Sequence, residues 1–444
     1  MIWKLNIKLE YRMKYIKKVL ENDMNIIFVP MENTHIVAMG FFVKAGSRNE
    51  DDENNGVAHF LEHMMFKGTS HRTPTQLFTE LDSVGAIYNA VTTTQHTYYY
   101  VYGHMNSTKK ILDIVLDIYI NPLFNTKEIN LERKVILEEM GMIHDTPLMK
   151  LYSAMHKKIF KGTSLARDVI GTSETIESIG KRDFNKFRDS LYKPENTVFV
   201  IAGNISPSPL YKMIRQILAP IPNLPLEPRS YFDEKQIIFQ NMQKQVEPYV
   251  YVQKNNYLHQ AYVLLSFPMY DLYSYKNNEI DLLSQLLSNG FSSRLNKALR
   301  EENGITYVSE TYPIVYSDCG LFLLQMILNP VELFKGLKIM LRELKKTKNE
   351  LMTKEELIKI VNLTKNETVY SLTTPMEMLR YFGLNFLANR EFKPNLDQEF
   401  ASIKSVSREQ IRDVADEIFD RNKINLFIYG NVNVGKNDFD FLDV

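Results

Sequence analysis

The chain has 444 residues, which is long enough for two domains of common size. Hydrophobic residues make up 44% and charged residues 24% of it, as in an ordinary globular protein. Because Lys+Arg and Asp+Glu both number 53, the net charge gives no electrostatic reason to expect binding to nucleic acid or to an acidic membrane surface. A single cysteine, Cys319, excludes an internal disulfide framework and a cysteine-based metal cluster.

The N-terminal stretch, MIWKLNIKLEYRMKYIKK, is basic but lacks the apolar core of a secretory signal. Its excess of basic residues would suit a mitochondrial presequence, although it contains none of the serines typical of one. No run in the chain approaches the roughly 20 apolar residues of a membrane span. We therefore expect a cytoplasmic protein without a membrane anchor, with mitochondrial import as the less favoured alternative.

The apolar stretch NNGVAHFLEHMMFKGT, residues 54–69, contains three residues that are costly to bury without partners. On a helix, His59 and His63 are four residues apart and share a face, so both imidazoles can reach one metal ion. Glu62 flanks that face and is suited to accept a proton from a water molecule that attacks a carbonyl. His-x-x-Glu-His is the order found in inverzincins. The stretch therefore predicts one catalytic zinc ion per chain.

A third zinc ligand is expected from the helix pattern LERKVILEEMGMIHD, residues 131–145. Glu132 and Glu139 are seven residues apart, about two helical turns, so both can face one point. Glu138 competes with Glu139, and periodicity alone does not choose between them. Without the two histidines, this stretch would more often be an acidic face in contact with solvent.

The chain repeats one plan at a constant shift in residue number, which is 423 − 196 = 227. Three pairs of segments share this shift: strands at 196–204 and 423–431, and helices that start at 179 and 406 and at 126 and 353. Strand-like runs such as IVAMGFFVKAG alternate with longer helices without a strict βαβ order. The pattern predicts an α+β fold made of two tandem homologous α/β domains.

Prolines crowd the region after the first copy, which is typical of a linker. We expect a zinc-binding domain over 1–206, a linker region over 207–245 and a homologous domain over 246–444. At the same shift, the three motif positions fall on Leu286, Asn289 and Gly290, none of which is a histidine or a glutamate. Gaps could move this alignment by a few positions, but no histidine follows His259. We therefore expect the motif to have a function that belongs to the first copy alone.

Three segments together resemble the pitrilysin family of zinc peptidases: GSRNEDDENNGVAHFLEHMMFKGT, NAVTTTQHTYYY and ERKVILEEM. The processing-peptidase branch, which includes the catalytic subunit of the mitochondrial processing peptidase, is most similar. The resemblance extends over about residues 15–433 and implies that the two domains form a clamshell. It also implies that zinc is bound by His59, His63 and Glu139, and it selects Glu139 over Glu138.

The resemblance implies roles for further residues. Glu62 would be the general base, and Glu132 would tune the metal site from behind the ligands. The segment FSSRLNKALREENGITYVSE matches the part of the second domain that supplies an arginine and a tyrosine, here Arg300 and Tyr307, to bind or polarise the scissile carbonyl. Read alone, an arginine on a helix end and a tyrosine in a strand are ordinary structure.

Asn89 and Ala90 match the edge strand with which this family pairs an extended peptide substrate. The favoured function is thus a zinc metalloendopeptidase that acts on extended or unfolded peptides, alone or as a homodimer. One alternative is the catalytic subunit of an obligate hetero-oligomeric processing peptidase, whose mitochondrial partner carries a glycine-rich loop that this chain lacks. The other is a non-catalytic assembly subunit in which zinc is structural and fully ligated by the protein.

Overall fold

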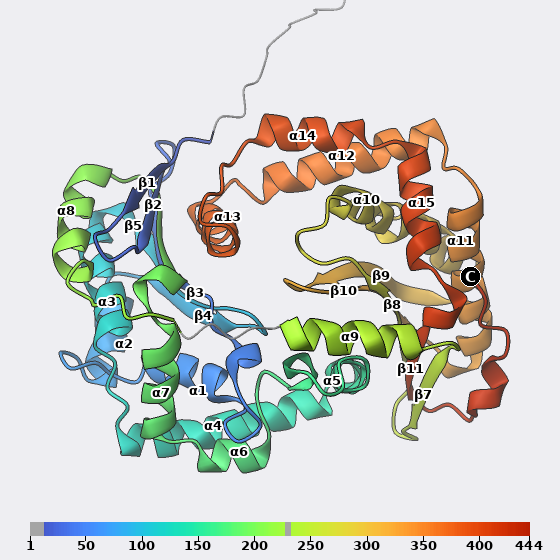
Figure 1. Ribbon diagram of the computed structural model, residues 1–444, viewed down its shortest axis with the longest axis horizontal. Helices are drawn as coiled ribbons and strands as arrows, with labels where there is room; N and C mark the ends of the chain where they lie inside the picture. Colours follow the sequence, from blue (N-terminus) through green and yellow to red (C-terminus); the bar gives the residue numbers. More distant parts are fainter. Residues whose placement is uncertain (1–12, 227–231) are drawn as a thin grey trace, which may run out of the picture. The chain divides into compact units, whose positions relative to one another are not determined.

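The computed structural model describes residues 13–226 and 232–444 (Figure 1). The first twelve residues of the stretch considered as a targeting segment, and part of the predicted linker, lie outside these described residues. Two compact units are present: the first is Met1–Glu138, Asp168–Arg229 and Thr368–Ala401, and the second is Glu139–Arg167, Ser230–Glu367 and Ser402–Val444. Among the described residues, no helix is both long enough and apolar enough to span a lipid bilayer.

The first unit is built on a six-stranded mixed sheet with the strand order β1-β2-β6-β3-β5-β4. Its strands are β1 (Ile16–Val19), β2 (Asn25–Pro30), β3 (Ile36–Val43), β4 (Ile87–Thr92), β5 (Thr97–His104) and β6 (Thr197–Gly203). Only β2 and β6 pair in parallel, and the other neighbours pair antiparallel. The central strands β3 and β6 are almost entirely buried, as expected for strands covered on both faces.

Helices cover both faces of this sheet (Figure 1). Those that pack on its strands are α1 (Val57–Met65), α2 (Pro74–Ser83), α3 (Thr108–Ile120) and α13 (Pro375–Ala388). The unit also contains α6 (Ser173–Ser178), α7 (Lys181–Leu191), α8 (Pro207–Leu218) and the first part of α4 (Thr126–Asp145). Successive strand residues point to opposite faces. The ring of Phe41 therefore stacks on Tyr119 of α3 at a centroid distance of 3.9 Å, whereas Phe42 packs under α13. A Cβ atom on Gly383 would lie 2.4 Å from the Phe42 ring, so this close approach requires glycine.

The second unit repeats this topology without the first strand, in the order β7-β11-β8-β10-β9. Its strands are β7 (Tyr249–Lys254), β8 (Ala261–Met269), β9 (Thr306–Val315), β10 (Gly320–Leu328) and β11 (Asn425–Gly430). Its helices are α5 (Pro147–Ile159), α9 (Phe232–Lys244), α10 (Asn277–Ser288), α11 (Leu333–Asn349), α12 (Lys354–Tyr370) and α15 (Arg408–Ile418), and α14 (Leu396–Ser405) begins in the first unit and ends in the second. As in the first sheet, only one pair of strands, β7 and β11, is parallel.

Short helical turns connect these elements. The 3-10 turns are Ser47–Asn49, Met105–Ser107, Ser164–Ala166, Pro194–Asn196, Pro330–Glu332, Arg421–Lys423 and Lys436–Phe439, and one π-helical turn spans Asn296–Glu301. The π-helical turn leads into β9 and carries Arg300 near its end.

The two halves of the chain exchange one helix each. Helix α5 directly follows α4, and α13 directly follows α12, so α5 and α13 occupy equivalent places in the repeat. Yet α5 packs on β8 and β11 of the second sheet, and α13 packs on β3 and β6 of the first. The side chains of α5 that do so are Leu151, Met155 and Ile159, in one apolar cluster with Leu264 and Phe427.

The predicted α+β class with two similar units is confirmed, and the repeat is visible element by element. Helices α7 and α15 start at 181 and 408, and α4 and α12 start at 126 and 354, close to the predicted shift. Helices α1 and α10 start at 57 and 277, a smaller shift, so the constant shift that placed His59 on Leu286 does not hold there. The compact units do not coincide with the predicted spans 1–206 and 246–444, because of the helix exchange, and the span 207–245 contains two helices.

Candidate metal centre

The first turn of α1 is fixed by a buried carboxylate. Glu50 is fully buried and accepts hydrogen bonds from the backbone N–H groups of Gly56 and Ala58 and from the side chain of Asn55, each at 2.8 Å. A carboxylate at a helix N-terminus satisfies N–H groups that have no partner within the helix and is stabilised by the helix dipole. Gly56 itself has φ of 96°, a conformation that favours glycine, and a Cβ atom there would meet the carbonyl oxygen of Ile170 at 2.8 Å. The start of α1 is therefore closely determined.

The apolar residues of α1 are all buried: Val57, Ala58, Phe60, Leu61, Met64 and Met65. Phe60, for example, packs edge-on against Phe184 of α7 at a centroid distance of 5.0 Å. His59, Glu62 and His63 are only half-buried. Packing of the apolar side therefore holds the helix and leaves the three polar side chains together on the other.

The predicted ligands come together. Each of His59, His63 and Glu139 offers one ligand atom, and these atoms all lie within 4.8 Å of one another. Glu138, the competing residue, is exposed and does not belong to this group. The boundary between the units falls inside α4, directly before Glu139, but the helix continues through it to Asp145.

The separation of the three ligand atoms suits zinc. Bonds of about 2.0–2.2 Å to His and Glu in a tetrahedral site place neighbouring ligand atoms about 3.4 Å apart, so small side-chain rotations would close the group around an ion. The electrostatics agree, because burial, with a smaller contribution from the nearby His63, lowers the pKa of His59 to about 3. The imidazole is therefore neutral at neutral pH, as a metal ligand must be.

Glu132 contacts one of the candidate ligands. Its Oε1 lies 2.9 Å from Nδ1 of His63, and its Oε2 lies 2.6 Å from Nζ of Lys67. Burial raises the pKa of Glu132, but the hydrogen bonds with His63 and Lys67 outweigh it, and the net pKa is lowered. An ionised Glu132 keeps the proton of His63 on Nδ1 and so directs Nε2 toward a metal. Lys67 is a member of this group that the spacing argument did not reveal.

Glu62, the predicted general base, does not belong to this group of three. Its Oε2 accepts a hydrogen bond of 2.6 Å from the hydroxyl of Thr92, at the end of β4. Two of the residues expected to bind the substrate, Asn89 and Ala90, lie on the same strand, which ends the first sheet. The side chain of Asn89 accepts a hydrogen bond from the N–H of Ala90 at 2.8 Å.

Arg300 and Tyr307 contact each other within the second unit. The guanidinium carbon of Arg300 lies 4.7 Å from the centroid of the Tyr307 ring and 4.7 Å from that of Phe291. Both rings are largely exposed, by 79% for Tyr307 and 68% for Phe291, so the arginine is flanked by aromatic faces at the surface of its unit. Sequence reasoning did not identify Phe291, although it opens the segment that carries the family resemblance.

Three further residues of the centre were not predicted: Glu50, Lys67 and Thr92. Glu50 gave a weak signal, as a carboxylate shortly before the left-handed Gly56 that precedes an apolar helix. Thr92 and Lys67 gave none, because a threonine in a strand and a lysine after a helix are common. Their contacts depend on how separate elements pack, which a local pattern does not encode.

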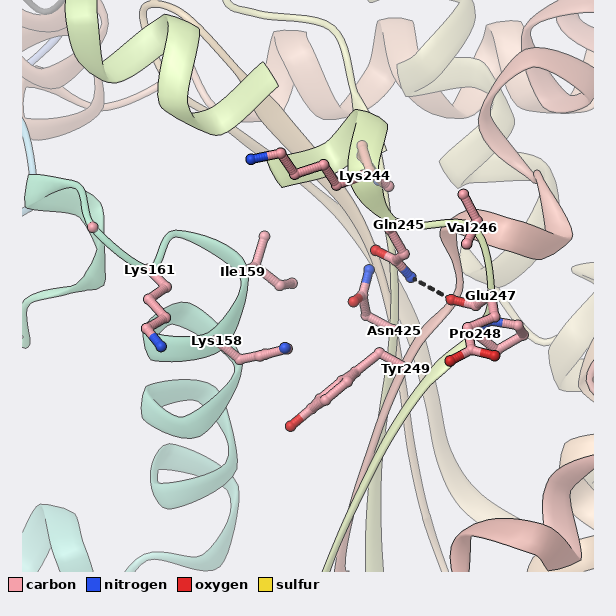
Figure 2. A pocket seen from close by; sticks show the side chains of 12 residues that line it. Lys158, Ile159, Lys161, Lys244, Gln245, Val246, Glu247, Pro248, Tyr249 and Asn425 are labelled. Carbon is pink, nitrogen blue, oxygen red and sulfur yellow. Dashed lines mark hydrogen bonds between the residues drawn. The ribbon is translucent and has the colours of Figure 1, made fainter. Parts of the chain in front are cut away.

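A separate cavity of about 610 Å³ lies in the second unit, between the end of α5 and the segment that leads into β7 (Figure 2). Lys158 extends over the ring of Tyr249, with its Nζ 4.2 Å from the ring centroid. Gln245 donates a hydrogen bond to the backbone oxygen of Glu247 on the same segment. No residue of the predicted metal centre lines this cavity, so it is distinct from the candidate catalytic site.

Comparison with known proteins agrees with these features. Residues 26–173 match the family described as "Insulinase (Peptidase family M16)", and residues 178–364 match "Peptidase M16 inactive domain". An "Uncharacterized zinc protease" of Rickettsia bellii is 33% identical over 307 residues, which are 68% of this chain and 71% of that protein. The "Mitochondrial-processing peptidase subunit beta" of Caenorhabditis elegans is 36% identical over 187 residues, but these are only 42% of this chain and 41% of the relative.

A solved structure shows the same fold. "The crystal structure of a protease from Helicobacter pylori" matches with a TM-score of 0.85 at 22% identity, covering 94% of this chain and all of that one. The inactive-domain match begins in the last part of the first copy, at residue 178, and continues into the copy that lacks the His-x-x-Glu-His motif. From the shared motif, the matched domains and the zinc-protease relative, the chain is a member of peptidase family M16, the pitrilysin family of zinc peptidases.

Proposed function

We propose that this chain is a zinc metalloendopeptidase that hydrolyses extended or unfolded peptides, with one zinc ion held by His59, His63 and Glu139. The observation that carries the proposal is the grouping of these three ligand atoms within 4.8 Å, with Glu62 on the same helix as the two histidines. Three protein ligands leave a coordination position open, which is typical of catalytic rather than structural zinc sites. Zinc in such a site makes a water molecule acidic near neutral pH and polarises a carbonyl.

The residues of the chain supply the rest of the reaction. Glu62 accepts the proton of the attacking water and later passes it to the leaving amine. Glu132 keeps His63 in the tautomer that binds the metal. Arg300 and Tyr307 are proposed to stabilise the negative charge that develops on the scissile carbonyl oxygen.

The edge strand β4 provides a way to bind peptides of many different sequences. An extended peptide that pairs with β4 through main-chain hydrogen bonds next to Asn89 and Ala90 would be held with little demand on its side chains. This mode of binding supports a broad specificity for unfolded or extended segments.

The zinc content of the purified chain, measured together with cleavage of a quenched fluorescent peptide library, tests the proposal. We expect one zinc per chain and cleavage that a chelator abolishes. Glu62→Gln should retain zinc but lose at least about 100-fold in kcat, since a general base contributes about 10²–10⁴-fold. Cleavage by Glu62→Gln at the wild-type rate would refute the proposed mechanism.

The neighbouring carboxylates Glu138 and Glu139 allow a matched test of which residue binds zinc. Glu139→Gln replaces the carboxylate with a neutral amide, a much weaker zinc ligand, so this variant should lose its zinc on dialysis. Glu138→Gln changes an exposed carboxylate outside the ligand group and should keep one zinc per chain. Equal zinc content in the two variants would exclude Glu139 as a ligand.

The similarity to the beta subunit of mitochondrial processing peptidases favours a second candidate function, the catalytic subunit of a hetero-oligomer. Zinc content of one per chain without cleavage would support this candidate. Light scattering of the purified chain, combined with the peptide assay on the same sample, separates it from a self-sufficient enzyme, because only the latter cleaves peptides as a monomer or homodimer.

A further inference from the structure

A short hydrogen bond connects the candidate general base to the edge strand of the first sheet. The hydroxyl of Thr92 donates to Oε2 of Glu62 at 2.6 Å. A threonine hydroxyl has a single hydrogen, so this donor is committed to the carboxylate. Hydrogen bonds from O–H to an ionised acceptor are short and roughly twice as strong as those between neutral groups. The contact therefore fixes one oxygen of Glu62.

Thr92 is held in turn by the sheet. Its partner across the strand pair is Thr97, which is fully buried and donates to the carbonyl oxygen of Ala45 at 2.8 Å. The two threonine hydroxyls lie 3.4 Å apart. A β-branched side chain has few χ1 rotamers in a strand, so the position of the Thr92 hydroxyl is set by the backbone of β4. The orientation of Glu62 is thus tied to the sheet as well as to α1.

We propose that Thr92 is a positioning residue for Glu62. It holds Oε2, so that the carboxylate presents its other oxygen, Oε1, for proton transfer in one fixed direction. This inference rests on the proposed role of Glu62 as general base. It has a consequence for substrate binding, because Thr92 ends the strand that also carries Asn89 and Ala90. One strand would then both hold the peptide and orient the base that acts on it.

Thr92→Val tests the inference, because valine keeps the branched shape and removes the hydroxyl. We expect kcat to fall about 10–100-fold, the size of effect produced by a misplaced catalytic group. KM should be unchanged and one zinc per chain retained, because neither the edge of β4 nor the ligands are altered. Thr92→Ser, which restores the hydroxyl, should recover most of the lost kcat. A merely structural threonine would not produce this separation of kcat from KM.

Thr93→Val is the matched control, since the Thr93 hydroxyl bonds within the following turn to the carbonyl oxygen of His96 at 2.9 Å. We expect this variant to keep the wild-type kcat. A Thr92→Val enzyme with wild-type kcat, while Glu62→Gln is inactive, would overturn the positioning role and leave the proposed function intact.

A second readout does not depend on activity. In crystal structures of the wild-type protein and Thr92→Ser, the Glu62 carboxylate should adopt one orientation, with Oε2 against the hydroxyl. In Thr92→Val it should rotate away or occupy more than one orientation. An unchanged Glu62 in that variant would refute the inference. If the wild-type chain binds zinc and cleaves no peptide, the proposed function fails, and the crystallographic comparison still decides the role of Thr92.

Discussion

Helices α4 and α12 occupy equivalent places in the two units, and one pair of matched positions shows how the units differ. Position 132 plus 227 is position 359. In the first unit, Glu132 contacts His63 of α1 at 2.9 Å. In the second unit, Lys359 donates to the backbone and side-chain oxygens of Ser292, just after α10, at 3.0 and 3.2 Å. Both side chains tie the long helix to an earlier segment of the same copy, but only Glu132 contacts an imidazole.

A direct ion pair strengthens the corresponding junction in the second unit. Arg294 bonds to both carboxylate oxygens of Glu356 on α12, at 2.9 and 3.0 Å, and also to Thr347 at 3.0 Å. In the first copy of the repeat, the same junction carries the candidate metal ligands His59, His63 and Glu139, of which Glu139 falls in the second compact unit. The second copy therefore holds the equivalent helices together without a metal motif, and a few side chains distinguish its junction from that of the candidate metal centre.

The largest expected effect comes from replacing Glu132 of the first unit with lysine, the residue at the matched position 359 of the second unit. Glu132→Lys removes the acceptor for His63 and places a second cation beside Lys67. Because loss of such a partner typically costs about 10–100-fold in metal affinity or activity, we expect a decrease of about that size in zinc affinity. Competition with a chromogenic chelator measures it.

The reciprocal change is the control for that comparison. Lys359→Glu replaces an exposed hydrogen bond in the second unit, so zinc affinity and kcat should stay at their wild-type values. If Lys359→Glu impaired zinc binding as strongly as Glu132→Lys, the two positions would act through general stability and not through His63.

The next largest effect that we expect is a loss of stability of the first unit at low pH. Burial lowers the pKa of His96, in the β4–β5 connection, to about 4, whereas the β9–β10 connection contains no histidine. Below its ordinary pKa of about 6.5, the unfolded chain binds a proton at this position that the folded chain does not. The first unit should therefore lose stability as the pH falls from about 6.5 toward 4, by about 2 kcal/mol between pH 7 and pH 5.

His96→Gln should remove this contribution. Hydrogen exchange of amides in the first sheet, measured at pH 7 and pH 5 with the same zinc concentration and corrected for the intrinsic pH dependence of exchange, reports the change. We expect a smaller loss of protection in the variant than in the wild type, with the second sheet unaffected. An identical pH response in both proteins would exclude His96 as its source.

The smallest expected effect concerns the ion pair of the second unit. Arg294→Met keeps much of the side-chain volume but leaves Glu356 without its bidentate partner. The pair is mostly buried, with side-chain exposures of 10% and 26%, so we expect a loss of about 1–2 kcal/mol in the free energy of unfolding. Zinc affinity should not change. Arg412→Met, which breaks the more exposed pair with Asp413, should cost less than about 0.5 kcal/mol in the same denaturation experiment.

The sequence predicted those residues of the candidate metal centre that lie at a regular spacing on a single helix. His59 and His63 share a helical face because they are four residues apart, and the structure brings them together. Spacing allowed either Glu138 or Glu139, and only the family resemblance separated them. The bonds of Glu50 and Thr92 were not predictable, because each depends on the packing of two segments that local patterns treat separately.

A similar limit applies to the fold. The repeat was predictable because α7 and α15, or β6 and β11, carry the same pattern at a nearly constant separation. The exchange of α5 and α13 was not, since an amphipathic pattern indicates which face of a helix is buried and not which sheet covers it. For this reason the predicted domain boundaries differ from the compact units.

The helix exchange has a consequence for synthesis on the ribosome. The last strand of the first sheet ends at Gly203, but the helix that covers its Phe42 face begins only at Pro375. At about 5–20 residues per second, synthesis of the roughly 170 residues in between takes about 10–35 s. Throughout this interval, the part of the chain already made does not contain the helix that covers this face in the finished fold.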